Sequence, residues 1–568
     1  MVYSISILAN KSNIYGISKD VEGLLKLFED TTDYEVKVCD PLEPPLVCDL
    51  AIHLEVPVYV WMPWAKKNFF VVNPEWYVDA WDVYMPKFDQ IIVKNTKTLG
   101  RFSEWLVTCV DWAHPLPPKG FTYPTPTRDE FIWVLGASVN KRAYVSALVP
   151  LWKATYPKLT ITTTTPLEAI KLPPNVTILV KEFNDPVERV NYFGQFKGQV
   201  CCSRAEGFGY TAAEAELFGA FTILNSLEPY LQAYKNDYRV AFLPSRLDGD
   251  FDLGANLGAL EEALDCAMDA FSTYTLNDCL SRREKHSYRW MKFSDTWNQI
   301  VDAAGVSNLP NPQLPPVLSH ENCPPISIIT LIYNRKKFFD LACHNIMISD
   351  YPKDKIEWIL VDDSDDPVEQ NSDVIVQASN SCKPMKMVYV PLSKKTPVSE
   401  KRNIGVKTAT SEIILMMDDD DHYPETSFRR RVAWLTKHPW KPKAVSATTI
   451  ACYDLVTAVS AVNSPPMGLP LSQRISEATL TFYKSWWTEK SFPSDVIVGE
   501  GETFLSGREM DVLEIPPQQI IVAFSHGRNV SSRRVPKGDG VTPGCFWGFP
   551  KEFLEFIHGI AGIKVQQS

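Results

Sequence analysis

Four consecutive carboxylates, Asp418 to Asp421, directly follow the apolar run 413–417. A run of that length and character predicts a strand buried on both faces of a parallel sheet. Ligands of open α/β sheets bind beyond the carboxyl ends of the strands, so the acids are expected where chemistry takes place. Because crowded carboxylates repel one another, a hard divalent cation would offset their charge. The alternative is a solvated acidic loop without a ligand.

Two further strands are predicted to bring polar groups to the same edge. The first, 326–333, is followed by Asn334 and Arg335, and the second, 357–361, by a pair of aspartates that ends at Asp363. Together with the acidic run, three successive strands then deliver polar side chains to one rim of a sheet.

The first half of the chain carries a second set of candidates. A predicted strand ends at Gly136, and Lys141 and Arg142 follow at the start of a helix. Two cations beside a helix N-terminus favour an anion such as a diphosphate. Further along, Glu206 lies before a predicted helix and Glu214 within it, so both can point into one cleft. The alternative is an ordinary amphipathic helix with an acidic start.

Proline-rich stretches divide the chain, which at 568 residues exceeds what one core usually supports. The stretch 115–126 indicates a boundary between two lobes, and 307–325 indicates a stiff linker. We therefore expect lobes at 1–120 and 121–306, the linker 307–325, and a separate domain at 326–568.

Composition narrows the class of protein. The net charge of -11 argues against a general nucleic-acid binder, and no apolar run is long enough to span a membrane. The start of the sequence has no basic segment followed by a long apolar one, and the cysteines are scattered, so a cytoplasmic location is expected. His53, inside a predicted strand, is interpreted as a buried core histidine, with a catalytic group as the alternative.

The order of these motifs in the second half resembles the inverting glycosyltransferases of family 2, which have a GT-A fold. The resemblance implies nucleotide-sugar donors and a metal, Mn²⁺ or Mg²⁺, on the donor diphosphate. It assigns nucleotide binding to Asn334, Arg335, Asp363, Arg402 and Asn403, and metal binding to Asp418 and Asp420.

An inverting sugar transfer also needs a carboxylate that takes the proton of the acceptor hydroxyl. The segment 498–508 supplies Glu500 and Glu502 and resembles the acidic motif of the family, with Gly501 where the family commonly has Asp. Glu500 is preferred as the base, and Glu502 stays open. His526 resembles a late histidine that joins the metal in some GT-A enzymes, and a structural role is the alternative. A loop with Arg533, Arg534 and Lys537 is a further candidate for covering the diphosphate, and a solvated loop is the alternative.

The stretch SRAEGFGYTAAEAELFGA, residues 203–220, resembles the Glu-to-Glu motif of the retaining glycosyltransferases of family 4, which have the two-lobed GT-B fold. The resemblance implies that Glu206 holds hydroxyls of the donor sugar and that Glu214 holds the ribose. The family's phosphate-binding Arg is replaced by Ala137. The remaining donor contacts that it implies are Lys141, Arg142, and the backbone around Gly207 and Gly209.

Together the two resemblances imply an α/β chain with two Rossmann-like lobes of GT-B type followed by a separate GT-A-like domain. The implied function is a bifunctional glycosyltransferase, retaining in the first half and metal-dependent and inverting in the second, that acts on a glycan or glycoconjugate acceptor. The alternative is that only the C-terminal domain is catalytic and the N-terminal half binds a nucleotide sugar or a glycan.

Overall fold

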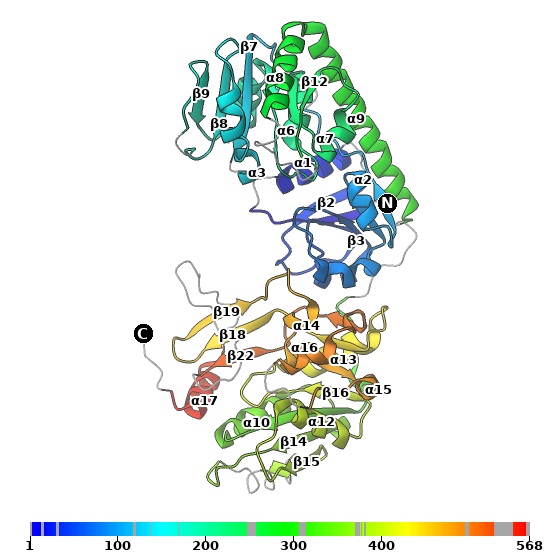
Figure 1. Ribbon diagram of the computed structural model, residues 1–568. Coiled ribbons are helices and arrows are strands. Elements are labelled where there is room, and N and C mark those ends of the chain that lie inside the picture. Colours follow the sequence, from blue (N-terminus) through cyan, green and yellow to red (C-terminus); the bar gives the residue numbers. More distant parts are fainter. Residues whose placement is uncertain are drawn as a thin grey trace. The chain divides into compact units, whose positions relative to one another are not determined.

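The computed structural model divides the chain into two compact units (Figure 1). The first comprises Met1–Tyr77 and Met85–Asn311, and the second comprises Val78–Tyr84 and Pro312–Ser568. Among the described residues, no helix is long and apolar enough to cross a membrane. The structure describes residues 3–12, 16–29, 33–117, 121–136, 138–167, 170–183, 185–246, 257–305, 314–369, 375, 378–379, 382–494, 499–526 and 549–563.

Two parallel six-stranded sheets form the first unit. Their strand orders are β2-β1-β3-β4-β5-β6 and β12-β11-β10-β7-β8-β9. The strands are β1 (Tyr3–Leu8), β2 (Tyr34–Cys39), β3 (Cys48–Leu54), β4 (Ala65–Val71), β5 (Gln90–Val93), β6 (Val107–Cys109), β7 (Arg128–Gly136), β8 (Leu159–Thr163), β9 (Val176–Val180), β10 (Phe196–Val200), β11 (Phe221–Asn225) and β12 (Val240–Leu243).

Helices lie in several of the connections between these strands, because parallel neighbours cannot be joined by tight turns. The helices are α1 (Gly16–Glu29), α2 (Thr96–Arg101), α3 (Val139–Arg142), α4 (Val145–Leu148), α5 (Pro186–Phe193), α6 (Tyr210–Phe218), α7 (Glu228–Tyr234), α8 (Leu257–Ser272) and α9 (Leu276–Ala303). A capping box of Thr275 and Asp278 starts α9, which ends by packing Phe293 and Trp297 into the core of the first sheet. His53 is buried in β3, as the sequence indicates.

A mixed seven-stranded sheet, in the order β15-β14-β13-β16-β20-β17-β21, forms the centre of the second unit, and a three-stranded sheet, β19-β18-β22, accompanies it. Strands β15, β14, β13 and β16 run parallel, whereas β20 is antiparallel to both of its neighbours. The strands are β13 (Ile326–Ile332), β14 (Ile356–Asp362), β15 (Lys386–Pro391), β16 (Ile413–Met416), β17 (Ala444–Ser446), β18 (Ile450–Asp454), β19 (Val459–Asn463), β20 (Thr481–Tyr483), β21 (Val512–Glu514) and β22 (Val522–Ser525).

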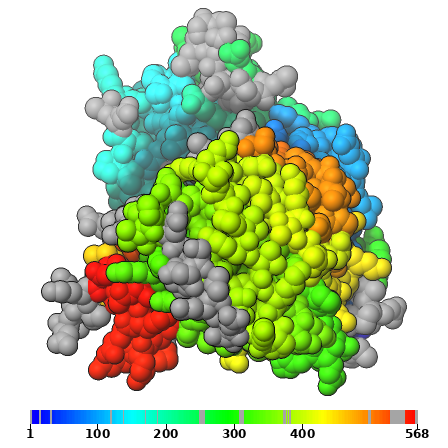
Figure 2. Space-filling view, turned by 90° about the horizontal axis from the view of Figure 1, so that it is seen from below, coloured from blue at the N-terminus to red at the C-terminus, as the bar shows by residue number. Residues whose placement is uncertain are grey.

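Every residue of β14 and β16 is buried, which explains the apolar sequence of β16 and the apolar run 358–361 of β14. The helices of this unit are α10 (Phe339–Ile348), α12 (Val398–Thr408), α13 (Ser427–Lys437), α14 (Leu471–Arg474), α15 (Lys484–Glu489), α16 (Glu500–Leu505) and α17 (Lys551–Ala561). The last of them, red in Figure 2, packs Ile557 into an apolar cluster with Phe338 and Leu341.

One short segment from early in the sequence, Val78–Tyr84, belongs to the second unit. The indole of Trp81 donates to the carbonyl oxygen of Met467 at 2.8 Å, and Nη1 of Arg474 lies 3.5 Å from the hydroxyl of Tyr84. The second unit is therefore discontinuous in sequence.

Candidate active site

Three adjacent parallel strands bring the predicted polar groups to one edge of the seven-stranded sheet. Strand β13 lies between β14 and β16, with Ile332 opposite Asp362 and Ile329 opposite Met416. The residues that follow these strands therefore leave the sheet at the same edge, where ligands of open α/β sheets bind.

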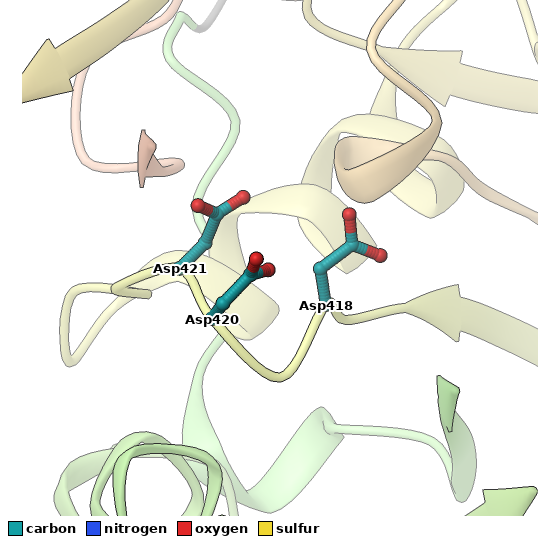
Figure 3. Close-up of side chains that lie close together, drawn as sticks. All are labelled: Asp418, Asp420 and Asp421. Atoms are coloured by element: carbon teal, nitrogen blue, oxygen red, sulfur yellow. The ribbon is translucent and has the colours of Figure 1, made fainter. Parts of the chain in front are cut away.

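The loop after β16 brings three carboxylates together. Oxygens of Asp418, Asp420 and Asp421 lie within 4.8 Å of one another, and the side chains project to the same side of the loop (Figure 3). The backbone amide of Phe524 donates to Oδ1 of Asp421 at 3.0 Å and so holds that side chain. The Asp-x-Asp pattern indicated only Asp418 and Asp420. The signal for Asp421 was the unbroken run of four aspartates.

Burial determines the charge of this acidic loop. It raises the pKa of Asp419 to about 7 and, with the charges of Asp420 and Asp418, raises the pKa of Asp421 well above its ordinary value. Burial acts on Asp420 in the same direction, but Arg335 and His526 hold the pKa of that carboxyl below its ordinary value. The raised pKa values show that the crowded carboxyl groups of Asp419 and Asp421 resist ionisation when no further cation is present.

Arg335 and His526 are the two predicted residues that contact this loop directly. Nη1 of Arg335 lies 2.5 Å from Oδ2 of Asp420 and 3.1 Å from Oδ1 of Asp419. Nε2 of His526 lies 3.1 Å from the same Oδ2 of Asp420. The structure therefore places both side chains on the acidic loop, and the nucleotide contact of Arg335 stays a prediction.

The residues present fit a hard divalent cation. Three carboxylates converge, and the buried Oδ2 of Asp419 has no hydrogen-bond partner among the described residues. Carboxylate oxygens are the ligands that Mg²⁺ and Mn²⁺ prefer in proteins.

The sequence did not indicate the residue that clamps the acidic loop. Asn345, fully buried on α10, donates from Nδ2 to the carbonyl oxygen of Asp421 at 2.7 Å and accepts at Oδ1 from the amide of Tyr423 at 3.0 Å. Its Oδ1 also lies 3.1 Å from Nδ1 of His422. One side chain thus contacts three consecutive loop residues, at the backbone of Asp421 and Tyr423 and at the side chain of His422.

The hydroxyl of Tyr423 fixes the other end of the loop. It accepts from the amide of Asp418 at 2.9 Å and donates to the carbonyl oxygen of Ala478 at 3.0 Å. Both ends of the acidic loop are therefore tied to the body of the second unit.

Asp363, predicted to bind the nucleotide, is buried and paired with a cation. Nζ of Lys401 lies 2.6 Å from its Oδ1, and the amide of Thr396 donates to Oδ2 at 2.9 Å. Asn334, with φ of 49°, turns the chain after β13 and donates from Nδ2 to Asp365 at 2.7 Å. These contacts fix the two strand ends next to the acidic loop.

A buried ion pair lies near Asp418. Nε of Arg402, on α12, donates to Oε1 of Glu500 at 2.8 Å, and both residues are about 5% exposed. Glu502 is exposed and accepts from Nε2 of Gln473 at 2.7 Å. The two candidate bases therefore differ: one is the buried partner of an arginine and the other is on the surface.

Asn403 makes its hydrogen bonds inside the protein. Its Oδ1 accepts from the indole of Trp487 at 3.0 Å and from the amide of Phe492 at 3.1 Å, and its Nδ2 donates to the carbonyl oxygen of Phe492 at 2.9 Å. In the structure this residue anchors neighbouring segments, and its predicted place near a nucleotide is untested.

In the first unit, the predicted phosphate-binding cations are also engaged by the chain. Nζ of Lys141 lies 3.6 Å from Oε1 of Glu206. Nη2 of Arg142 donates to the carbonyl oxygen of Gly136 at 2.9 Å and to Oγ1 of Thr163 at 2.8 Å. Lys141 and Glu206 are therefore neighbours, whereas Arg142 holds the turn after β7.

Glu214 has a different environment from Glu206. It is buried on α6, and Nη2 of Arg189 donates to both of its carboxylate oxygens at 2.7 and 2.8 Å. Burial alone would raise the pKa of Glu214, but the charge of Arg189 and the contact with His114 hold it well below its ordinary value.

Two glycines before α6 allow side chains from other segments to lie close to the backbone. Gly209 has φ of 93°, and a Cβ there would lie 2.5 Å from the ring of Tyr230. A Cβ on Gly207 would lie 2.9 Å from Oδ1 of Asn73. The sequence did not indicate Glu75, whose pKa is raised to about 7 by burial and by the charge of Glu206.

Some predicted residues lie outside the described residues. They are Ala137, Arg533, Arg534 and Lys537.

With this geometry in place, comparison with known proteins identifies one part of the chain. Residues 327–453 match the family model described as Glycosyl transferase family 2. The second unit contains a glycosyltransferase domain. The match covers β13, β14, β15 and β16 and the acidic loop, that is, the strand ends described above.

Two curated relatives are the poly(ribitol-phosphate) beta-N-acetylglucosaminyltransferases TarS of Staphylococcus aureus strains Mu50 and MW2. Each is 24% identical over 112 residues, which is 20% of this chain and 19% of the relative. The chain thus spans about a fifth of the length of these curated relatives.

Solved structures with similarity include S. aureus TarS, 17% identical with a TM-score of 0.27, which covers 36% of this chain and 37% of TarS. A second is the mannosyltransferase PcManGT from Pyrobaculum calidifontis in complex with GDP-Man and Mn²⁺, 19% identical with a TM-score of 0.28. That match covers 40% of this chain and 61% of PcManGT.

Proposed function

We propose that the second unit transfers a sugar from a nucleotide-sugar donor to a hydroxyl of a glycan or glycoconjugate acceptor, with inversion at the anomeric carbon. The observation that carries this proposal is the convergence of Asp418, Asp420 and Asp421 at the strand ends of a family 2 glycosyltransferase domain. A nucleotide sugar carries a diphosphate, and crowded carboxylates bind such a group through a shared divalent ion.

The chain's own residues have distinct roles in this proposal. Asp418, Asp420 and Asp421 would hold Mn²⁺ or Mg²⁺, with His526 beside them. When bound, the ion would neutralise the charge that develops on the departing nucleoside diphosphate. Asn345 and Tyr423 keep the acidic loop in place. The buried pair of Arg402 and Glu500 lies near Asp418.

The test uses the full chain and a panel of nucleotide sugars that includes an N-acetylglucosamine donor, because the curated relatives are N-acetylglucosaminyltransferases. We expect release of nucleoside diphosphate with Mn²⁺ and none with a chelator. Asp420→Asn should lower the rate by about 100-fold or more, since it removes a ligand of the ion. The matched control is Asp354→Asn. Asp354 is exposed and lies just before the start of β14, at the end of the strand away from the acidic loop, so this variant should keep the wild-type rate. Full turnover by Asp420→Asn would contradict the metal role.

For the first unit we propose the narrower of two functions, binding of a nucleotide sugar or glycan without transfer. Supporting this are the internal contacts of Arg142 with Gly136 and Thr163, and of Glu214 with Arg189, which occupy the groups expected to hold the donor. The Asp420→Asn variant separates the alternatives. Chelator-resistant release of nucleoside diphosphate by that variant would establish a second transferase in the first unit, whereas donor binding without release would support the binding function.

A further inference from the structure

Gly501, on α16, leaves a space that a carboxylate from another segment fills. A Cβ at Gly501 would lie 2.6 Å from Oε1 of Glu477 and 2.9 Å from Cδ of the same residue. Those separations are too short for real atoms, so residue 501 has no room for a side chain while Glu477 is in this position. The carboxyl group of Glu477 therefore lies against the backbone of α16, next to the buried Glu500.

Glu477 is closely connected to the acidic loop. It is the first residue of the short 3₁₀ turn Glu477–Thr479, directly before β20. The carbonyl oxygen of the next residue, Ala478, accepts from the hydroxyl of Tyr423, which in turn accepts from the amide of Asp418. Two hydrogen bonds thus connect the backbone next to Glu477 with the backbone of Asp418, the first residue of the proposed ion site.

Three carboxylates lie close enough to Arg402 for their charges to act on its guanidinium. Burial lowers the pKa of Arg402. The charges of Glu500, Asp418 and Glu477 raise it by more, so the net shift is upward. Glu500 is buried and bonded to Arg402, and therefore acts as the fixed counter-ion of that guanidinium. Glu477 is partly buried as a residue, whereas Glu500 is buried.

A general base must come within hydrogen-bond reach of the proton that it removes. Taking Glu500 as the base would break its buried ion pair with Arg402, at a cost of several kcal/mol. Glu502 is exposed and is bonded to Gln473. Glu477 lies beside Gly501 and close enough to the Arg402–Glu500 pair for its charge to act on Arg402.

We propose that Glu477 is the catalytic base of the second unit. This inference rests on the proposed function. The acceptor hydroxyl oxygen forms a bond to the anomeric carbon of the donor sugar while the bond from that carbon to the diphosphate oxygen breaks. The hydroxyl proton passes to the carboxylate of Glu477, and the nucleoside diphosphate leaves with the bonding electron pair.

The main test is Glu477→Gln in the full chain, because glutamine keeps the size of the side chain but does not take the proton. We expect kcat to fall about 100- to 10,000-fold, with KM for the donor and the Kd of Mn²⁺ within about threefold of wild type. The matched control is Glu489→Ala, an exposed glutamate on α15, which should keep the wild-type kcat.

A second variant separates a base from a structural residue. Glu477→Ala opens the space beside residue 501, and adding Gly501→Asp returns a carboxylate to it from the neighbouring segment. We expect the double variant to recover at least tenfold in kcat over Glu477→Ala. Recovery is not expected from Gly501→Asp if Glu477 only supports packing, and a double variant no faster than Glu477→Ala overturns the inference.

Two further results are decisive. Wild-type kcat in Glu477→Gln, or a loss that falls entirely on donor or Mn²⁺ binding, overturns the role of Glu477 and leaves the proposed function standing. A wild-type chain that releases no diphosphate from any donor overturns the proposed function, and the base assignment with it.

Discussion

The guanidinium of Arg335 lies against the carboxylate of Asp420, with Nη1 2.5 Å from Oδ2. The two residues are 85 positions apart and follow neighbouring strands, β13 and β16. Among the residues that the structure describes, Arg335 is the arginine bonded to the acidic loop through its carboxylates. A divalent ion at the same carboxylates would compete with it.

The first prediction concerns this competition. Arg335→Met should destabilise the second unit without metal, because the carboxylates of Asp419 and Asp420 lose their partner, at a cost of about 3 kcal/mol. Added Mn²⁺ should then raise the melting temperature more in the variant than in wild type, since the ion replaces the missing charge. Thermal unfolding with and without Mn²⁺ measures both effects.

Arg429→Met is the matched control for that experiment. Arg429 pairs with Asp350, and the side chains of Arg429 and Arg335 are similarly exposed, 24% and 23%. The control should lose stability without any added response to Mn²⁺. An equal response in both variants would show that Arg335 and the ion do not share a site.

The second prediction concerns the clamp on the acidic loop. Asn345→Leu should cost about 2–4 kcal/mol, because the carbonyl oxygen of Asp421 and the amide of Tyr423 lose their buried partner. The loosened loop should also raise the Kd of Mn²⁺ about tenfold or more. Urea unfolding and calorimetric Mn²⁺ titration test the two parts.

A buried asparagine in the first unit, Asn225, provides the control. Its Oδ1 accepts from the amide of Ser203 at 3.0 Å and its Nδ2 donates to the carbonyl oxygen of Ser203 at 2.9 Å. Asn225→Leu should lose comparable stability and bind Mn²⁺ as wild type does. Unchanged Mn²⁺ affinity in Asn345→Leu would mean that the loop keeps its shape without the clamp.

The third prediction concerns pH and His53. Burial lowers the pKa of this imidazole to about 4, against a smaller opposing effect of Asn68. Its Nδ1 accepts from the amide of Val58 at 3.0 Å, so Nε2 carries the proton and contacts Oδ1 of Asn68 at 3.1 Å. The folded chain therefore holds the neutral ring.

The sign of the pH effect follows. Between about pH 6.5 and pH 4 the unfolded chain binds a proton at this residue that the folded chain does not. The contribution to stability is complete above about pH 6.5 and decreases as the pH falls, by about 2 kcal/mol between pH 7 and pH 5. His53→Gln should remove this part of the pH dependence of urea unfolding, whereas the exposed His320→Gln should not. Identical slopes in wild type and His53→Gln would contradict a neutral buried ring.

The sequence predicted those parts of the site that depend only on which residues follow one another along the chain. A buried apolar run followed at once by acids places those acids at the end of a strand, because the chain is continuous. The three strand ends with Arg335, Asp363 and Asp418 were found in this way, and the structure brings them to one edge.

The contacts that distant segments make with the site could not be predicted from the sequence. Asn345 and Glu477 are ordinary residues in their local context, and only packing brings them to the acidic loop and to Gly501. Glu206 and Glu214 show the same limit. That both point into one cleft stays a prediction, and the partners that the structure gives them, Lys141 and Arg189, come from other segments of the chain.

The segment Val78–Tyr84 has a consequence for how the chain is made. Trp81 and Met467, which share a hydrogen bond inside the second unit, are 386 residues apart. During synthesis the early partner leaves the ribosome long before the late one exists, so this contact forms only near the end of translation. The cost in loop-closure entropy is modest, because it grows only with the logarithm of the separation. Cutting the gene at the proline-rich linker would yield a C-terminal polypeptide that lacks Trp81 and Tyr84, and co-expression of both pieces would be needed to restore the complete second unit.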